Sequence, residues 1–374
     1  MADSSSSQRL WCVAQALMPA ASPLMGTLAK RVETSLDTAG TSARATSAGP
    51  RSRRMKYAAR RLLHSLFLLA GVSILSFLFA DLAPGDFFSE MRLDPGVTGG
   101  TVDALRARHG LDRPLPVRYA AWLGSMARGE FGYSLAYNSQ VGPLLRQRIP
   151  GTLLLTASAT LLAWLMAIPL GIWNAARRGT WSDSLIKASL SILLSIPELL
   201  LTIILLVIAV ETGWLPAGGM HAPGAESLPA SEQFRDTLRH LVIPVAVLVL
   251  GMLPVLVRHV RSAVADCLDS PFALAARAHG IPRRRRLFRH LLPAALNPLI
   301  SLFGFSLGTL LSASLLVEVL VGWPGLGPLF LEAIMARDFA LVLGVVMSST
   351  TLLITGNLVA DLLLYRADPR IRTS

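Results

Sequence analysis

The chain has 374 residues, of which 52% are hydrophobic and only 16% are charged, whereas soluble proteins carry about 25% charged residues. This composition argues against a soluble globular enzyme and against a disordered or collagen-like chain. The net charge of +12 could indicate nucleic-acid binding, but an excess of basic residues on the cytoplasmic side of a membrane explains it equally.

Residues 1–54 differ in composition from everything that follows. They are rich in Ser, Ala and Thr and end in the basic cluster Arg51, Arg53 and Arg54, which predicts a disordered extension. Residues 10–18 loosely resemble a signal peptide, but the apolar run is short and contains Gln15. A third alternative is that translation starts at Met55, where a basic segment leads into the first apolar span.

Apolar segments long enough to cross a membrane recur along the rest of the chain. A bilayer core takes about 20 apolar residues in a helix. Six such spans are expected, at residues 62–82, 152–173, 185–210, 241–257, 294–317 and 340–364. The fourth is short and contains Pro244 and Pro254, so we expect a kinked helix that its flanking residues extend. Residues 152–365 would form a five-helix membrane core.

Basic residues near the span ends predict the orientation. They cluster before the first span, between the second and third, between the fourth and fifth, and in the tail 366–374. Because cytoplasmic loops are enriched in Lys and Arg, both termini are expected in the cytoplasm. The external segment 83–151 also holds arginines, but it is longer than the loops of about 60 residues to which this rule applies. Its many Pro and Gly residues predict a small external subdomain.

Two catalytic motifs can be tested against the sequence. No Gly-Lys pair precedes a Ser or Thr as in the phosphate-binding loop of ATPases. A GxSxG pattern occurs at 304–308, but it lies inside an apolar span instead of at a strand-to-helix turn. We interpret Gly304 and Gly308 as small residues that let two membrane helices pack closely. The two cysteines, Cys12 and Cys267, are too far apart in sequence to suggest a disulfide framework or a metal site.

The cytoplasmic loop 262–293 is the most informative stretch. Asp269 or Ser270 can cap a helix, Pro271 suits its first position, and Gly280 suits its end. A helix over residues 271–279 is therefore expected, with alanines along most of its length. Such a helix could enter a groove on another protein, or it could be a surface turn whose arginines lie at anionic lipid headgroups. The residues alone leave both alternatives open.

This loop resembles the EAA motif of ABC importer permeases. The resemblance rests on Ala275-Ala276, Gly280 and Leu292-Pro293, while Leu274 replaces the Glu of the motif and His290 its Ile. Residues 276–280 resemble the version found in di- and oligopeptide permeases. Other stretches match that subfamily in order: GVS at 71–73, LAPGD at 82–86, GLDRPLP at 110–116, GEFGYS at 129–134, IPLG at 168–171, SIP at 195–197, WPGLG at 323–327 and DPRIR at 368–372.

The resemblance covers about residues 55–372 and implies an all-α, six-span type I ABC importer permease in the bacterial inner membrane. Such a subunit forms half of a translocation pore with a second, related permease, and it receives substrate from an external binding protein. One or two cytoplasmic ATPase subunits bind the ATP, so no cofactor or metal is expected on this chain. The implied ATPase-coupling residues are Ala275, Ala276, Arg277, Gly280, Leu292 and Pro293. Similar permeases carry peptides, nickel chelates, glycosides or antimicrobial peptides.

Polar residues inside the spans are the candidates for a transport pathway. Glu198 lies deep in the third span, where it could face the pathway or form a structural hydrogen bond. Its neighbour Pro197 predicts a local irregularity of this helix. Thr350, Asn357 and Asp361 lie on nearly one face of the sixth span and could line the pathway or join helices. We expect Glu211 and Glu318, at outer span ends, to be solvated. Four tryptophans are expected at the membrane interfaces, namely Trp173, Trp181, Trp214 and Trp323.

An alternative function is a membrane channel or an ion-driven carrier without ATP coupling. That class predicts intramembrane charges on several helices or an inverted internal repeat. The sequence offers one deeply placed carboxylate and no evident repeat, so the ATP-coupled permease is preferred.

Overall fold

The computed structural model describes residues 50–82, 87–89, 99–108, 110, 112–282, 285 and 292–367. The chain divides into two units, Met1–Lys56 and Tyr57–Ser374. In the first unit the described residues, 50–56, open helix α2. The expected extension 1–54 therefore lies largely outside the described residues, as does the tail from residue 368 onward.

Long apolar helices make up most of the second unit. They are α2 (Pro50–Leu82), α5 (Val141–Ala176), α8 (Ala230–Leu268), α11 (Leu292–Val321) and α13 (Phe339–Ala367). Each contains a segment long and apolar enough to cross a membrane. The predicted all-helical, multi-span fold class is confirmed, and α8 extends well beyond residues 241–257, as its short apolar core required.

The third predicted span is not one helix. Helices α6 (Trp181–Leu194) and α7 (Glu198–Thr212) replace it, and they are bent by 94° at the break between them. If the bent pair counts as one span, the described part of the chain has six spans. Pro197 explains the break, because its ring cannot donate a helical hydrogen bond and displaces the carbonyl one turn earlier. The sequence predicted a local irregularity here but not its size.

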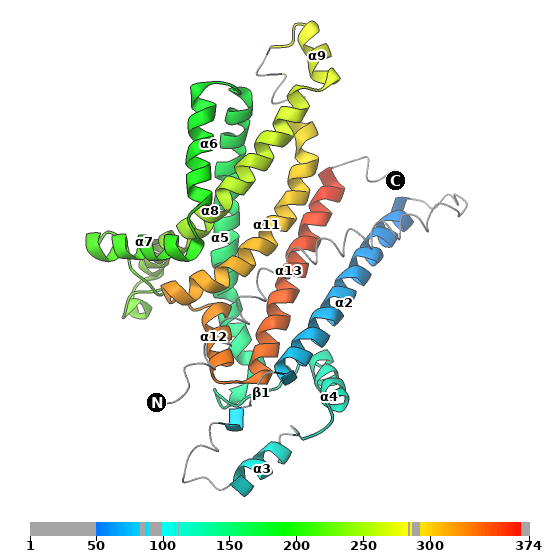
Figure 1. Cartoon of the computed structure of the whole chain (residues 1–374), viewed down its shortest axis with the longest axis vertical. Helices are drawn as coiled ribbons and strands as arrows, with labels where there is room; N and C mark the ends of the chain where they lie inside the picture. The colour runs from blue at the N-terminus through cyan, green and yellow to red at the C-terminus, as the bar shows by residue number, and fades with distance from the viewer. Residues whose placement is uncertain are drawn as a thin grey trace. The chain divides into compact units, whose positions relative to one another are not determined.

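Short elements lie at both ends of the long helices. At one end are α3 (Gly99–Arg108), α4 (Leu115–Ala127), α12 (Leu326–Met335) and an antiparallel hairpin of β1 (Tyr133–Ser134) and β2 (Ser139–Gln140). At the opposite end, beyond α8, is α9 (Pro271–Ala278) (Figure 1). The hairpin was not predicted, and α5 begins at Val141, well before residue 152. Helix α5 thus includes residues 141–151, which the sequence assigned to the external segment.

Close packing of α5 on α8 forms the centre of the hydrophobic core. Ala159, Ala163 and Ala167 are fully buried, and their spacing of four residues places them on one face of α5. One turn further, a Cβ built on Gly171 would lie 2.6 Å from Cβ of Val260. Small side chains let two membrane helices approach closely and gain van der Waals contact.

Helices α11 and α13 pack through the two glycines of the GxSxG pattern. A Cβ built on Gly304 would lie 2.9 Å from Cβ of Ala360, and one on Gly308 would lie 2.4 Å from a methyl carbon of Leu353. Ser306 between them is fully buried, donates to the Phe303 carbonyl at 2.7 Å and accepts from Trp164 Nε1 at 2.9 Å. The packing interpretation of this motif is confirmed.

Candidate coupling and pathway sites

Helix α9 begins at a side-chain cap. The Ser270 hydroxyl donates to the Cys267 carbonyl at 2.7 Å and accepts from the backbone N–H of Ala273 at 3.3 Å. Pro271 follows as the first helical residue, where its missing N–H costs no helical hydrogen bond. Ser270 and Pro271 thus determine the start of the helix, as the sequence predicted.

The end of α9 depends on Gly280. Its φ is +72°, in the left-handed region that glycine adopts without strain. The backbone N–H of Ile281 then donates to the Ala276 carbonyl at 3.2 Å, the capping bond of a Schellman motif. The predicted helix 271–279 is confirmed to within one residue.

The two faces of α9 differ. Ala273 and Ala276 are buried, and α9 packs against α8. Ala275, Ala278 and Gly280 are exposed, and Leu274 is 60% exposed. The described outer face therefore carries Leu274, small alanine side chains and, at the end of the helix, His279. The side chains of Arg277, Leu292 and Pro293 lie outside the described residues, although α11 begins at Leu292.

Ion pairs join the α5–α6 turn to the end of α8 that carries α9. Arg178 contacts both carboxylate oxygens of Asp269, at 2.8 and 2.9 Å. Asp183, only 2% exposed, lies 2.7 Å from Lys187 Nζ and 3.4 Å from Arg261 Nε. Asp269 caps α8 immediately before Ser270. These pairs join the α5–α6 turn and α6 to the end of α8 from which α9 extends.

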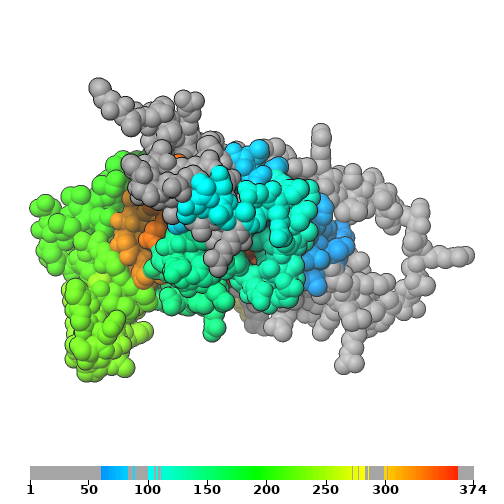
Figure 2. Space-filling view, turned by 90° about the horizontal axis from the view of Figure 1, so that it is seen from below, coloured from blue at the N-terminus to red at the C-terminus, as the bar shows by residue number. Residues whose placement is uncertain are grey.

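At the opposite end, a carboxylate fixes the hairpin to the membrane helices. Asp338 is 1% exposed and accepts hydrogen bonds from Ser134 Oγ at 2.7 Å and the Ala136 N–H at 3.0 Å. Nearby, the Tyr137 hydroxyl donates to Glu332 of α12. Figure 2, a view of this end, shows the orange surface of α12 between the teal and green parts of the chain.

Glu318 and Trp323 are buried, contrary to expectation. Glu318 is fully buried and accepts the Gly327 N–H at 2.7 Å, so the expected solvated carboxylate is wrong. Trp323, expected at the membrane interface, is also fully buried and donates from Nε1 to the Gly151 carbonyl at 2.9 Å. The cause is the turn between α11 and α12, which folds back onto α5. Glu211 is exposed, as expected.

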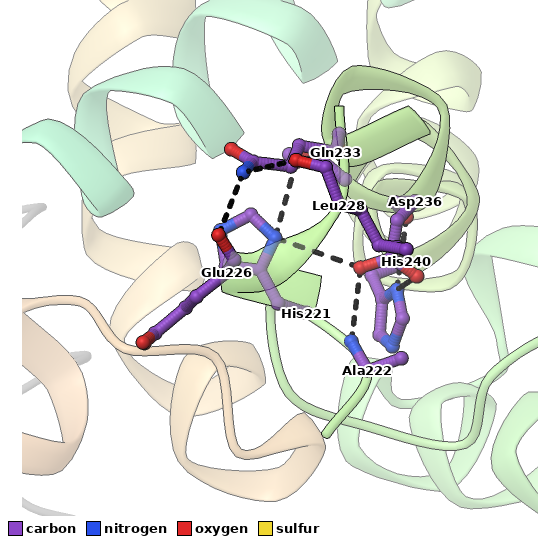
Figure 3. A network of polar contacts seen from close by, with 8 residues as sticks. His221, Ala222, Glu226, Leu228, Gln233, Asp236 and His240 are labelled. Carbon is purple, nitrogen blue, oxygen red and sulfur yellow. Dashed lines mark hydrogen bonds and ion pairs between the residues drawn. The ribbon is translucent and has the colours of Figure 1, made fainter. Parts of the chain in front are cut away.

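A second polar cluster holds the segment between α7 and α8 against the start of α8 (Figure 3). Asp236 lies between two histidines, 3.6 Å from His221 Nδ1 and 3.3 Å from His240 Nδ1, and accepts the Ala222 N–H at 2.9 Å. The Gln233 amide donates to the Leu228 carbonyl at 2.9 Å. These bonds satisfy backbone groups of a loop that has little secondary structure.

The candidate pathway residues lie on two helices, α7 and α13. Glu198 is the first residue of α7, and its side chain lies against Gly251 of α8. Thr350 donates to the Val346 carbonyl of its own helix at 2.8 Å. Asn357 Oδ1 would lie 3.6 Å from a Cβ built on Gly304, at the contact of α13 with α11. The Asp361 side chain lies outside the described residues.

Comparison with known proteins identifies the family. A family model described as the inner membrane component of binding-protein-dependent transport systems matches residues 167–373. The oligopeptide transport system permease protein AppB of Bacillus subtilis (strain 168) is 36% identical over 84% of this chain and 98% of its own length. The chain belongs to this family.

Further relatives of this inner membrane component show the same coverage. A putative peptide permease protein of Brucella ovis is 34% identical over 86% of this chain and 100% of its own length. Among solved structures, a chain of the inward-facing MetNI methionine ABC transporter is similar, with a TM-score of 0.47, 22% identity, and coverage of 60% of this chain and 96% of that chain.

Sequence reasoning did not predict the contacts of three carboxylates of this inner membrane component, which hold its elements together. Asp183 and Asp269 are acidic residues near loops dominated by arginine, and that contrast was the available signal for ion pairs at this end of the helices. Asp338 follows α12 and could have been recognised as the cap of the next helix. Its contact with Ser134 could not be inferred, because it depends on how distant segments pack.

Proposed function

We propose that this chain forms half of the translocation pore of an ATP-driven importer and couples that pore, through the loop 262–293, to a separate cytoplasmic ATPase. The energy for transport then comes from ATP hydrolysis in that separate subunit. The residues assigned to coupling are Ala275, Ala276, Arg277, Gly280, Leu292 and Pro293.

The observation that carries the proposal is the outer face of α9. This face carries exposed Leu274 and small alanines, with His279 at its end, and it lies at the end of α8. Small side chains permit close approach of a partner surface, and buried apolar contacts supply the free energy of docking. The ion pairs Arg178–Asp269 and Arg261–Asp183 give the docked helix a rigid connection to α6 and α8.

We assign di- and oligopeptides, or a similar small solute, as the cargo. Support comes from the names of the relatives, which include peptide permeases matching 82–86% of this chain. The proposed pathway residues are Glu198, Thr350, Asn357 and Asp361.

The proposed assembly contains a second homologous permease, one or two ATPase subunits that bind the ATP, and an external substrate-binding protein. The exposed apolar surfaces of α2, α5 and α7 would contact membrane lipid or the second permease. Both termini and α9 would lie in the cytoplasm, and α3, α4 and the hairpin would face the binding protein. This chain itself would bind no cofactor.

Uptake by the reconstituted complex tests the proposal. Proteoliposomes that hold the complex, with ATP on the side that carries α9, should accumulate a labelled tripeptide only when both ATP and the binding protein are present. Uptake that continues without ATP would favour a channel or an ion-driven carrier instead.

A further inference from the structure

Glu198 lies near the centre of two apolar stretches that meet in the fold. It is near the centre of the apolar stretch 185–210, and it opens α7 at the 94° break. Its carboxylate lies beside Gly251, which is near the centre of the apolar stretch 241–257 in α8. An ionisable group at this depth is costly and usually faces a cavity or a partner.

The surroundings of Glu198 differ from those of the other buried carboxylates. Asp183, Glu318 and Asp338 are all sealed from solvent and accept hydrogen bonds from named groups. Glu198 is partly exposed, and within the described residues no hydrogen bond or ion pair reaches its carboxylate. A carboxylate accepts up to about four hydrogen bonds, so the Glu198 oxygens can still accept hydrogen bonds on their accessible side.

The other side of the carboxylate is closed by α8. A Cβ built on Gly251 would lie 2.6 Å from Oε1 and 3.1 Å from Cγ of Glu198. Glycine at this position therefore makes the room that the carboxylate occupies. A packed wall on one side and an open side on the other limit the directions from which a ligand can approach.

Position at the start of α7 is the simplest explanation for the residue type. The partial positive charge of a helix N-terminus stabilises a carboxylate there. That effect makes the charge tolerable, but it leaves the accessible oxygens without a partner among the described residues. A membrane-embedded carboxylate with open acceptor positions matches a primary ammonium, which carries the opposite charge and three N–H donors.

We infer that Glu198 is a transient binding site for an ammonium group of the transported solute, the α-amino group in the case of a peptide. This inference rests on the proposed function and names the chemical group that the pathway selects. The ammonium must bind weakly enough to be released on the other side of the membrane. Loss of this binding should therefore lower the uptake rate at low substrate concentration.

The test uses the complete transporter with its binding protein in proteoliposomes. The probes are labelled trialanine and N-acetyl-trialanine, which lacks the ammonium. Glu198→Gln keeps the shape of the side chain and removes its charge, whereas Glu198→Asp keeps the charge. Glu211→Gln is the matched control, because Glu211 is an exposed carboxylate at the other end of the same helix.

We expect Glu198→Gln to lower trialanine uptake about tenfold at subsaturating concentration, equivalent to about 1.4 kcal/mol. Glu198→Asp should lose less uptake than Glu198→Gln, because it keeps the charge, and Glu211→Gln should stay near wild type in both uptake and ATP hydrolysis without substrate. The inference is overturned if Glu198→Gln transports trialanine like wild type, or if its uptake of both peptides falls equally together with ATP hydrolysis. If the wild-type complex takes up neither peptide, the proposed function fails first and the inference with it.

Discussion

The Ser134 hydroxyl donates a hydrogen bond of 2.7 Å to the Asp338 carboxylate, although 204 positions separate the two residues. The other oxygen of the same carboxylate accepts the Leu341 N–H at 3.1 Å, at the start of α13. One buried side chain thus caps a membrane helix and fixes the hairpin that precedes α5. The end of the helices that carries the hairpin and α12 is held by this contact as well as by apolar packing.

Replacing Asp338 should loosen this end of the molecule. Asp338→Ala removes the acceptor of three donors, and we expect a loss of about 2–4 kcal/mol of stability from the charged hydrogen bonds and the helix cap. Asp338→Asn should lose less, because its amide oxygen still accepts. Thermal unfolding in detergent measures both, and an unchanged melting temperature for Asp338→Ala would contradict the anchoring role.

The turn between α11 and α12 should not tolerate even one added methyl group. A Cβ built on Gly325 would lie 2.3 Å from Glu318 Oε2 and 2.6 Å from Thr152 Oγ1. We expect Gly325→Ala to destabilise the protein by about 1–3 kcal/mol through overpacking. Gly142→Ala is the matched control, because nothing lies within 4 Å of its Cβ position. Equal melting temperatures for the two variants would show that the turn accommodates a methyl group and would contradict this prediction.

Asp183 should matter for coupling more than for assembly. Asp183→Ala removes the buried partner of Arg261 and Lys187, whose own side chains are 24% and 48% exposed. Water can reach both cations, so we expect the fold to survive at a cost of about 1–3 kcal/mol. We expect ATP hydrolysis that no longer drives uptake. Arg128→Ala, in a pair whose side chains are both 69% exposed, should behave as wild type. If Asp183→Ala retains the wild-type ratio of uptake to ATP hydrolysis, the ion pairs of Asp183 do not contribute to coupling.

Local signals in the sequence predicted the helices well. The cap at Ser270, the left-handed Gly280 and the apolar runs act over a few residues, so their structures follow from short-range chemistry. Gly304 and Gly308 were recognised as packing residues for the same reason. The EAA resemblance added the family, to which the chain does belong.

Errors arose where distant segments meet. Glu318 and Trp323 stand at a span end, and their position in the chain suggests contact with water or headgroups. The turn that follows folds back onto Gly151 and Thr152 and buries both side chains. Pro197 predicted an irregular helix but not a bend of 94°. The size of the bend depends on how α6 and α7 pack on α8 and α11. The burial of Glu318 and Trp323 and the size of the bend depend on tertiary contacts, which the neighbouring residues in the sequence do not indicate.

The most direct test of the account is whether an ATPase stays bound when the tagged chain is purified in mild detergent from its native membranes. The wild-type chain should retain a second permease and an ATPase. Gly280→Val should lose the ATPase, because a β-branched residue is strained in the left-handed conformation, by roughly 1–2 kcal/mol or more. Gly280→Asn should retain it, because Asn tolerates that conformation. Recovery of the wild-type chain alone, or equal ATPase retention by Gly280→Val and wild type, would contradict coupling through α9.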